Sequence, residues 1–366
     1  MIIQMEENNV EINIKDILFL LFGSILAGLI AKIPSFFGLI EDEYYAKNIS
    51  FIIAPILVMF FAWKKELNSK KLVFPAITII ASVLYINLLP SVESNNSIIL
   101  ACMHLPIFLW SVVGYTFIGG NLKDSTQRIN YLKFNGDLLV MCSLLILAGG
   151  LFSGITLGLF NLIDVKIEQF YFNYVVIMGL STVPLIATYL VFTNPSLVNK
   201  ISPIIAKLFT PFVFITLLTF LITLLFTGKN IYSDRNFLLI FNALLIGVMA
   251  IILFSVTEAT KNKLNKISLI ILLMLSILTI IVNGIALSAI VFRLTEFGVT
   301  PNRVAVLGSN LLIFINLILV SVKLFQVVSR KEPVEMVGVV IANFIPYYSF
   351  WAFLVAFLFP ILFQYK

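Results

Sequence analysis

Charged residues are scarce in this chain, and their scarcity decides its class. Asp, Glu, Lys and Arg make up 11% of the 366 residues, whereas hydrophobic residues make up 60%. Soluble domains hold about 25% charged and about 45–50% apolar residues, so the composition excludes an ordinary soluble domain. The apolar runs are continuous and about 20 residues long, the length at which a helix crosses a bilayer. Strands of a membrane barrel would instead alternate apolar and polar residues.

Histidine and cysteine are also nearly absent, which argues against the common metal sites. His104 is the single histidine, and no acidic, Asn or Cys residues cluster at the spacing of metal ligands. Cys102 and Cys142 each fall early in consecutive apolar runs that cross the membrane in opposite directions, so we expect them near opposite faces, too far apart for a disulfide. No P-loop or serine-nucleophile motif is present. We therefore expect no metal and no cofactor.

The length of the apolar runs predicts an all-α, polytopic transmembrane helix bundle with about 11 spans. It forms a single integral membrane domain over residues 1–366, with a short cytoplasmic tail at 1–15. The acidic tail is unlike a cleavable signal peptide, so we expect the first run to act as an uncleaved anchor. The predicted spans are roughly 16–38, 49–63, 72–90, 97–119, 137–163, 170–192, 204–227, 236–257, 267–292, 303–327 and 337–363.

Basic residues in the loops predict the orientation. With the N-terminus inside the cell, the inner segments carry most of the 24 Lys and Arg residues. Each inner loop between two spans then holds more than one of them, as the positive-inside rule requires. The same distribution explains the formal charge of +6 without nucleic acid as a partner. We expect the N-terminus inside and the C-terminus outside.

Charge gathers at one place between two long apolar runs, in ALSAIVFRLTEFGVTPNRVAVLGSN at 286–310. Gly298 can end the first helix in a left-handed conformation, Thr300 is a typical N-cap, and Pro301 suits the first position of the next helix. A helix N-terminus flanked by two arginines can receive a phosphate or carboxylate. The predicted ligand-binding residues are Arg293, Glu296, Thr300, Asn302, Arg303 and Asn310.

The same residues also have a structural interpretation. Arg293 and Glu296 are three residues apart and can form an ion pair on one helix face. Arg303 can pair with another acid of the outer face. The two pairs would then fix a tight helical hairpin without binding any ligand, and the sequence leaves both interpretations open.

Polar residues recur inside the last apolar runs. Amides in hydrocarbon seek partners, so one interpretation is hydrogen bonding between helices. The other is a binding cavity. The predicted cavity-lining residues are His104, Asn283, Asn316, Asn343 and Tyr347.

Glycines recur every four residues in the fifth run, at Gly150, Gly154 and Gly158. This spacing lets two helices approach closely, and we expect tight packing there. A glycine hinge is the alternative.

The residues Arg293, Phe297, Gly298, Thr300 and Arg303 match an Arg, an aromatic-Gly-x-Thr turn and a second Arg between two spans. In these about 25 residues the chain resembles the bacterial membrane family called domain of unknown function 4153. The resemblance implies a bacterial integral membrane protein of the cytoplasmic (inner) membrane, and it implies no activity. The high Ile, Lys, Asn and Phe content fits an AT-rich bacterial genome.

Three functional hypotheses follow. The first is a transport-type or ligand-binding protein that binds an anionic small molecule or a lipid headgroup at the hairpin 286–310. The second is a scaffold or assembly subunit of a membrane complex, with protein partners still open. The third is a membrane enzyme acting on a lipid-linked substrate, for which Glu296 is the only nearby acid–base candidate; we favour it least.

Overall fold

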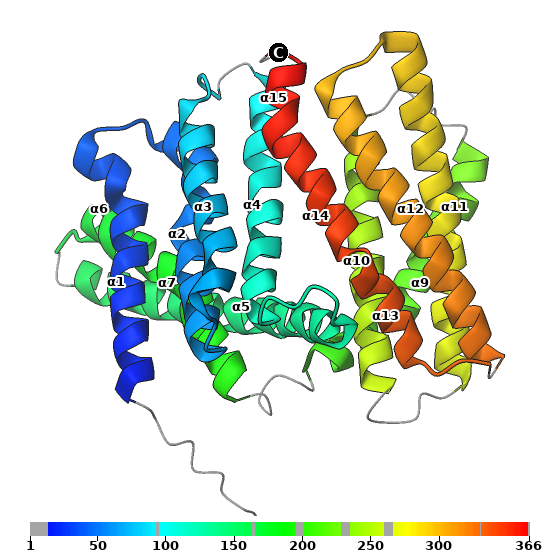
Figure 1. The fold of residues 1–366 in the computed structure, drawn as a ribbon, viewed down its shortest axis with the longest axis horizontal. Coiled ribbons are helices and arrows are strands. Elements are labelled where there is room, and N and C mark those ends of the chain that lie inside the picture. Colours follow the sequence, from blue (N-terminus) through cyan, green and yellow to red (C-terminus); the bar gives the residue numbers. More distant parts are fainter. Residues whose placement is uncertain are drawn as a thin grey trace, which may run out of the picture.

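The computed structural model describes residues 14–92, 95–162, 165–194, 201–227, 235–259, 266–329 and 331–364. Within these ranges the chain is helical and has no strand, which confirms the all-α prediction. The elements, labelled in Figure 1, are α1 (Ile14–Phe37), α2 (Glu41–Lys64), α3 (Ser69–Leu88), α4 (Asn96–Phe117), α5 (Ser125–Leu162), α6 (Glu168–Phe170), η1 (Tyr171–Val176), α7 (Ile177–Thr193), α9 (Ile201–Thr227), α10 (Arg235–Ala259), α11 (Lys266–Phe297), α12 (Pro301–Val328), α13 (Glu335–Asn343), α14 (Ile345–Phe353), η2 (Leu354–Leu358) and α15 (Phe359–Leu362).

Within the described ranges, nine helices are long and apolar enough to cross a membrane. They are α1 to α5, the segment α6–η1–α7, α11, α12 and the segment α13–α15. Helices α9 and α10 contain the shorter apolar stretches Phe209–Thr223 and Leu244–Val256. Several long apolar helices are what a multi-pass membrane protein requires. The count of about 11 crossings and the orientation stay predictions.

Two helices begin well before the predicted spans. Helix α2 begins at Glu41 rather than near 49, because three acids in its first turn suit the positive end of the helix dipole. Helix α5 begins at Ser125 rather than near 137, because the helix also includes the polar residues that precede the apolar run. Hydropathy locates only the apolar part of a helix, whereas the helix can continue through the polar residues on either side.

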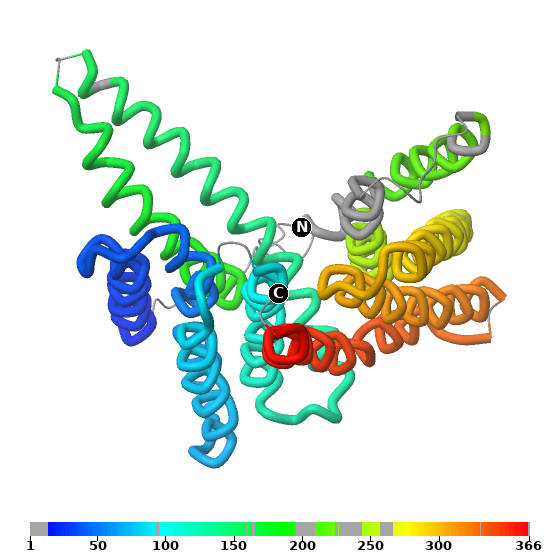
Figure 2. The backbone as a smooth tube through the Cα atoms, turned by 90° about the horizontal axis from the view of Figure 1, so that it is seen from above, coloured from blue at the N-terminus to red at the C-terminus, as the bar shows by residue number. Residues whose placement is uncertain are grey.

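The helices form two groups with separate hydrophobic cores, which lie side by side in Figures 1 and 2. Helices α1 to α4 and α7 enclose the first core, in which Phe60, Phe61 and Leu105 are buried. Helices α9 to α12 enclose the second, which includes Leu275 and Leu317. The last segment, α13–α15, runs obliquely between the two groups.

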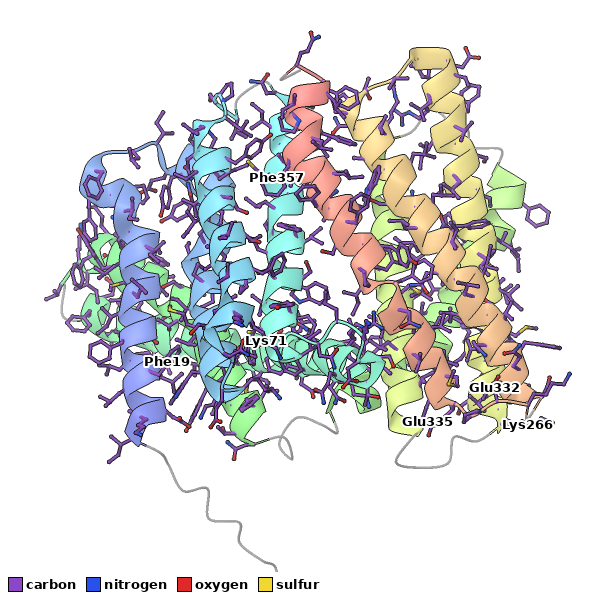
Figure 3. The ribbon with its side chains drawn as sticks, viewed as in Figure 1. Phe19, Lys71, Lys266, Glu332, Glu335 and Phe357 are labelled. Carbon is purple, nitrogen blue, oxygen red and sulfur yellow. The ribbon has the colours of Figure 1, made fainter. Side chains whose placement is uncertain are left out.

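This last segment is hydrogen-bonded to both groups. Toward the first group, the Phe357 carbonyl accepts a bond of 2.6 Å from Tyr85 of α3, and the Phe357 ring packs on Tyr85 and on Phe108 of α4 (Figure 3). The other bonds are Ser111 Oγ to Ser349 Oγ at 2.6 Å, Asn316 Nδ2 to Tyr348 Oη at 3.0 Å, and Trp351 Nε1 to Ser309 Oγ at 3.0 Å. The segment therefore joins the two cores.

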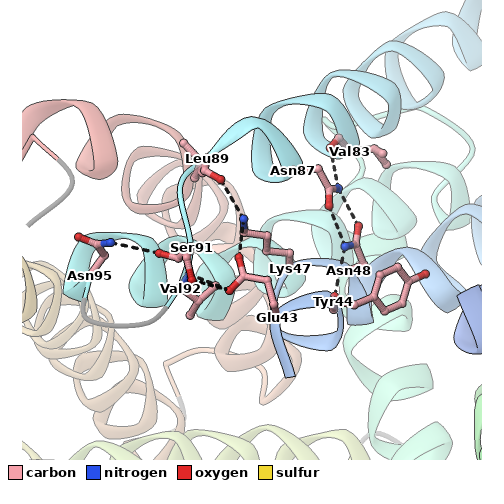
Figure 4. Close-up of polar contacts among 10 residues, drawn as sticks. All are labelled: Glu43, Tyr44, Lys47, Asn48, Val83, Asn87, Leu89, Ser91, Val92 and Asn95. Atoms are coloured by element: carbon pink, nitrogen blue, oxygen red, sulfur yellow. Dashed lines mark hydrogen bonds and ion pairs between the residues drawn. The ribbon is translucent and has the colours of Figure 1, made fainter. Parts of the chain in front are cut away.

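Polar side chains also hold the ends of α2 and α3 together (Figure 4). Lys47 forms an ion pair of 2.7 Å with Glu43 and donates to the Leu89 carbonyl at 2.8 Å. The amides of Asn48 and Asn87 bond reciprocally, at 2.9 and 2.8 Å. These contacts satisfy buried polar groups in pairs, as an apolar environment demands.

The glycine stripe of α5 does not pack as predicted. In the described part of the chain, a Cβ added at Gly150, Gly154 or Gly158 would meet no atom within 4 Å. Ser153, on a neighbouring face, instead accepts a hydrogen bond of 3.1 Å from Tyr171. Helix α5 thus turns that neighbouring face to the following segment, and its pair with α7 extends away from the other helices (Figure 2). The expectation of tight glycine packing was wrong within this chain.

Close helix approaches occur instead at other glycines, among them Gly308 of α12, where an added Cβ would overlap the Trp351 ring. We predict that Gly308→Ala lowers stability, by about 1–3 kcal/mol for overpacking. The matched substitution Gly154→Ala should leave stability unchanged or raise it by up to about 1 kcal/mol through helix propensity. Thermal unfolding of both variants in detergent checks this, and equal shifts in the two would contradict the described packing.

Candidate functional site

The turn between α11 and α12 has the local structure that its sequence predicts. Helix α11 ends at Phe297, and Gly298 follows with φ +77°. Thr300 is the N-cap of α12, its side chain accepting from the Arg303 N–H at 3.4 Å, and Pro301 is the first helical residue. The side chain of Thr300 thus caps the N-terminus of α12.

Arg303 closes this turn onto the backbone rather than onto an acid. Its Nη1 donates to the carbonyls of Phe297 and Gly298, at 2.7 and 2.6 Å. Its guanidinium also lies 5.6 Å from the centroid of the Phe297 ring, within cation–π range. Asn302 in turn bonds to Asn96 of α4 at 3.1 Å. Arg303 and Asn302 are therefore engaged in holding the hairpin, and among the described residues Arg303 forms no ion pair with an acid.

Arg293 is placed quite differently. Its Nη1 is buried, and no hydrogen-bond acceptor for it exists among the described residues. Glu296 is exposed, and within the same ranges neither residue forms an ion pair. The predicted Arg293–Glu296 pair was wrong, because Arg293 continues the buried face of α11 while Glu296 projects into the surroundings.

That buried face carries a line of polar residues. Positions 276, 279, 283, 286, 290 and 293 are spaced by three and four, which places them on one side of a helix. Four of them are polar, whereas Ala286 and Ile290 are buried and apolar. This side packs against α12. We call the buried polar residues at this interface the polar seam; they are Ser276, Thr279, Asn283, Asn310, Asn316 and Ser321.

Only part of the polar seam is satisfied by hydrogen bonds. Asn283 Nδ2 donates to the Asn310 carbonyl at 3.2 Å, and the Ser321 and Ser276 hydroxyls are 2.9 Å apart. Asn316 bonds to Tyr348 of the last segment. In the described chain, however, both side-chain polar atoms of Asn310 are buried without a partner, as are Oδ1 of Asn283 and of Asn316.

Such unpartnered atoms are concentrated on these two helices. Nine such atoms occur in the described ranges, and six of them belong to α11 and α12. Besides the four amide atoms just named, these are Arg293 Nη1 and Gln326 Oε1. Leaving a buried polar atom without a partner costs about 1–3 kcal/mol. These costs are concentrated on one helix pair, which makes it a candidate place for a bound polar group.

Arg293 lies beyond the polar seam, toward the end of α11. Arg293 and Asn283 are ten residues apart, which corresponds to roughly 15 Å along the helix axis, and the buried apolar residues Ala286 and Ile290 lie between them. Ser276 lies roughly 10 Å beyond Asn283. The stretch from Arg293 to Ser276 is comparable to the hydrocarbon core of a bilayer, about 30 Å thick.

The other predicted lining residues have different surroundings. His104 Nδ1 lies 2.9 Å from the Leu100 carbonyl of its own helix. Asn343 accepts a bond of 2.7 Å from Arg128 of α5, and Tyr347 is exposed. Of the five predicted residues, only Asn283 and Asn316 belong to the polar seam. The surroundings of His104, Asn343 and Tyr347 give no support to the idea that all five line one cavity.

Sequence reasoning missed two cavities of the described structure. One, of about 350 Å³, lies by the loops before α3 and after α4 and is lined by Lys65, Lys71 and Asp124 among others. The second, of about 290 Å³, lies between α3, α4, α5 and α14 and includes Arg128. The only signal of the second cavity in the sequence was the basic residue Arg128, which was used to predict the orientation of the chain and nothing else.

Comparisons with models of protein families, with curated proteins and with solved structures found no match. The resemblance to domain of unknown function 4153 therefore stays a prediction resting on the hairpin residues. Among the residues that the structure describes, no cluster of three or more His, Cys, Asp or Glu side chains is placed to hold a metal ion.

The two arginines should respond oppositely to substitution. Arg303→Gln removes two charge-assisted bonds to carbonyls and should destabilise the protein by about 1–3 kcal/mol. Arg293→Gln removes a buried nitrogen that has no acceptor in the described chain, and should leave stability unchanged or raise it. Thermal unfolding distinguishes the two variants. A larger loss for Arg293→Gln would show that this side chain has a stabilising partner.

Proposed function

We propose that this chain is a transport-type membrane protein, which binds an anionic solute at the α11–α12 hairpin and passes it along the polar seam. The observation that carries the proposal is the set of buried polar atoms without described partners on these two helices. Structural polar groups in membranes are ordinarily paired, and unpaired ones mark candidate pathways for polar solutes.

Arg293 is proposed to receive the anion. A guanidinium presents several N–H donors in a fixed fork that matches carboxylate and phosphate oxygens. Since no described carboxylate neutralises Arg293, an incoming anion would supply both the missing charge and the missing acceptor. Arg303, in contrast, bonds to the carbonyls of Phe297 and Gly298 and so holds the turn between α11 and α12.

Asn310 is proposed to bind the solute deeper in the membrane. Its amide offers a donor and an acceptor, both buried and without a described partner, at the level where Asn283 meets the α12 backbone. An amide of this kind can bind an oxygen or a hydroxyl of a solute equally well. Glu296 is exposed and outside the polar seam, so no observation favours the enzyme hypothesis.

The proposal includes the topology predicted from the loops. With the N-terminus in the cytoplasm of a bacterial cell, the Arg293 end of α11 faces outward, and the solute meets the hairpin first. The Lys323–Glu332 ion pair, 3.2 Å long, then lies at the cytoplasmic end of the same helix pair (Glu332 is labelled in Figure 3).

Uptake by proteoliposomes tests this function. Purified protein is reconstituted, and entry of radiolabelled phosphate, sulfate, acetate and glutamate is measured against protein-free liposomes. We expect uptake of at least one anion by the wild type. Both Asn310→Leu and Arg293→Gln should abolish it, because the first removes the internal amide and the second the anion receptor.

Thr295→Leu is the matched control, since Thr295 is exposed on α11 and bonds to its own helix at 2.8 Å. It should transport as the wild type does. If Asn310→Leu is more stable than the wild type and transports normally, the amide is only a structural cost. If the wild type takes up none of the four anions, the transport proposal fails.

A further inference from the structure

The cavity between α3, α4, α5 and α14 has an aromatic wall with a single charged residue, Arg128. Its volume is about 290 Å³. The aromatic lining residues are Phe74, Phe108, Tyr115, Tyr131, Phe350 and Phe353.

Three hydroxyl groups in the wall, those of Ser111, Ser349 and Tyr131, already have hydrogen-bond partners. Ser111 donates to the Phe108 carbonyl at 2.6 Å and lies 2.6 Å from the Ser349 hydroxyl. The two serines thus bond to each other and to the backbone, and Tyr131 donates to the Trp110 carbonyl at 2.6 Å. A ligand would therefore meet an apolar surface over most of its length.

Arg128 supplies the exception. Its Nη2 donates to Asn343 at 2.7 Å, but its Nε is buried and has no acceptor in the chain as described. No described Asp or Glu pairs with it. The side chain is thus held in place by one bond while its positive charge stays without a counter-ion, which fits an anionic group at this end of the cavity.

The residues at the rim of the cavity indicate whether it opens toward lipid or toward water. Phe74 and Phe350 are 50% and 61% exposed, and Leu122 is 59% exposed. Large apolar residues exposed on helices of this composition face acyl chains rather than water. Arg128 lies in the first turns of α5, just after the loop 118–124, at a helix end where headgroups meet the protein.

We propose that this cavity binds an anionic phospholipid, with a segment of one acyl chain between the aromatic rings and its phosphate group on Arg128. The volume lies at the low end of the range of ligand sites, about 300–1,000 Å³, so it holds part of one chain while the rest of the lipid stays in the bilayer. Because Arg128 lies on α5, Asn343 ends α13 and Ser349 lies on α14, the lipid would also tie the last segment to the other helices that line the cavity. The proposal does not depend on transport along the polar seam.

Native mass spectrometry of the detergent-purified full chain tests the proposal. Phosphatidylglycerol and phosphatidylcholine with identical chains are titrated into separate samples. We expect phosphatidylglycerol adducts to form at lower lipid concentration. Arg128→Gln should weaken phosphatidylglycerol binding by about tenfold or more, the effect of losing a charge-assisted hydrogen bond, and should abolish the preference. Ser349→Leu, which fills the cavity, should weaken binding of both lipids.

Lys123→Gln is the matched control, because it removes the same charge from an exposed residue of the preceding loop. It should bind phosphatidylglycerol like the wild type. Circular dichroism verifies that each variant is folded, and Arg128→Lys, which keeps the charge, should retain part of the preference.

Three results would overturn the assignment. The first is equal binding of the two lipids by the wild type, and the second is an equal loss in Lys123→Gln and Arg128→Gln. The third is displacement of phosphatidylglycerol by millimolar inorganic phosphate, since the site would then recognise the free anion without a chain.

Discussion

A bilayer offers no water to a polar atom, and this constraint governs how the helices of this chain are joined. Pro34 of α1 lacks an N–H, which leaves the Ile30 carbonyl without its usual helical donor, and the Tyr44 hydroxyl supplies one at 2.7 Å. The Asn48–Asn87 amide pair and the Tyr85 bond to Phe357 follow the same logic. Each satisfies a buried group with a side chain from another helix, so packing and hydrogen bonding select the same arrangement.

Helices α11 and α12 depart from this rule, and the contrast between two arginines makes the departure clear. Arg303 bonds to two carbonyls across the turn, whereas Arg293 has a buried nitrogen with no described acceptor. Both are of one residue type and flank one short turn. What separates them is their surroundings, since a guanidinium nitrogen of Arg293 is buried beside α11 whereas Arg303 reaches the carbonyls of the turn.

The sequence was sufficient wherever the physics is local. The apolar runs predict the helices, and Gly298, Thr300 and Pro301 predict how one helix ends and the next begins, because each effect acts within a few residues. It was insufficient where the partner is distant. The stripe around Gly154 does not reveal which face α5 turns to its neighbour, and nothing near Arg128 indicates that Asn343, 215 residues later, lies beside it. Lone amides such as Asn310 predict polarity within the membrane, but their missing partners become visible only in the fold.

The place of α13–α15 in the chain has a consequence for biogenesis. This segment follows both helical groups in the sequence and yet bonds to both, through Ser349 to α4 and through Trp351 to α12. During synthesis the two groups leave the ribosome before the segment that joins them. Until it inserts, the hydroxyls of Ser111 and Ser309 can use only backbone carbonyls of their own helices. The bonds of this segment to both groups therefore form late in synthesis, whereas α4 and α12 can already meet directly through the Asn302–Asn96 bond.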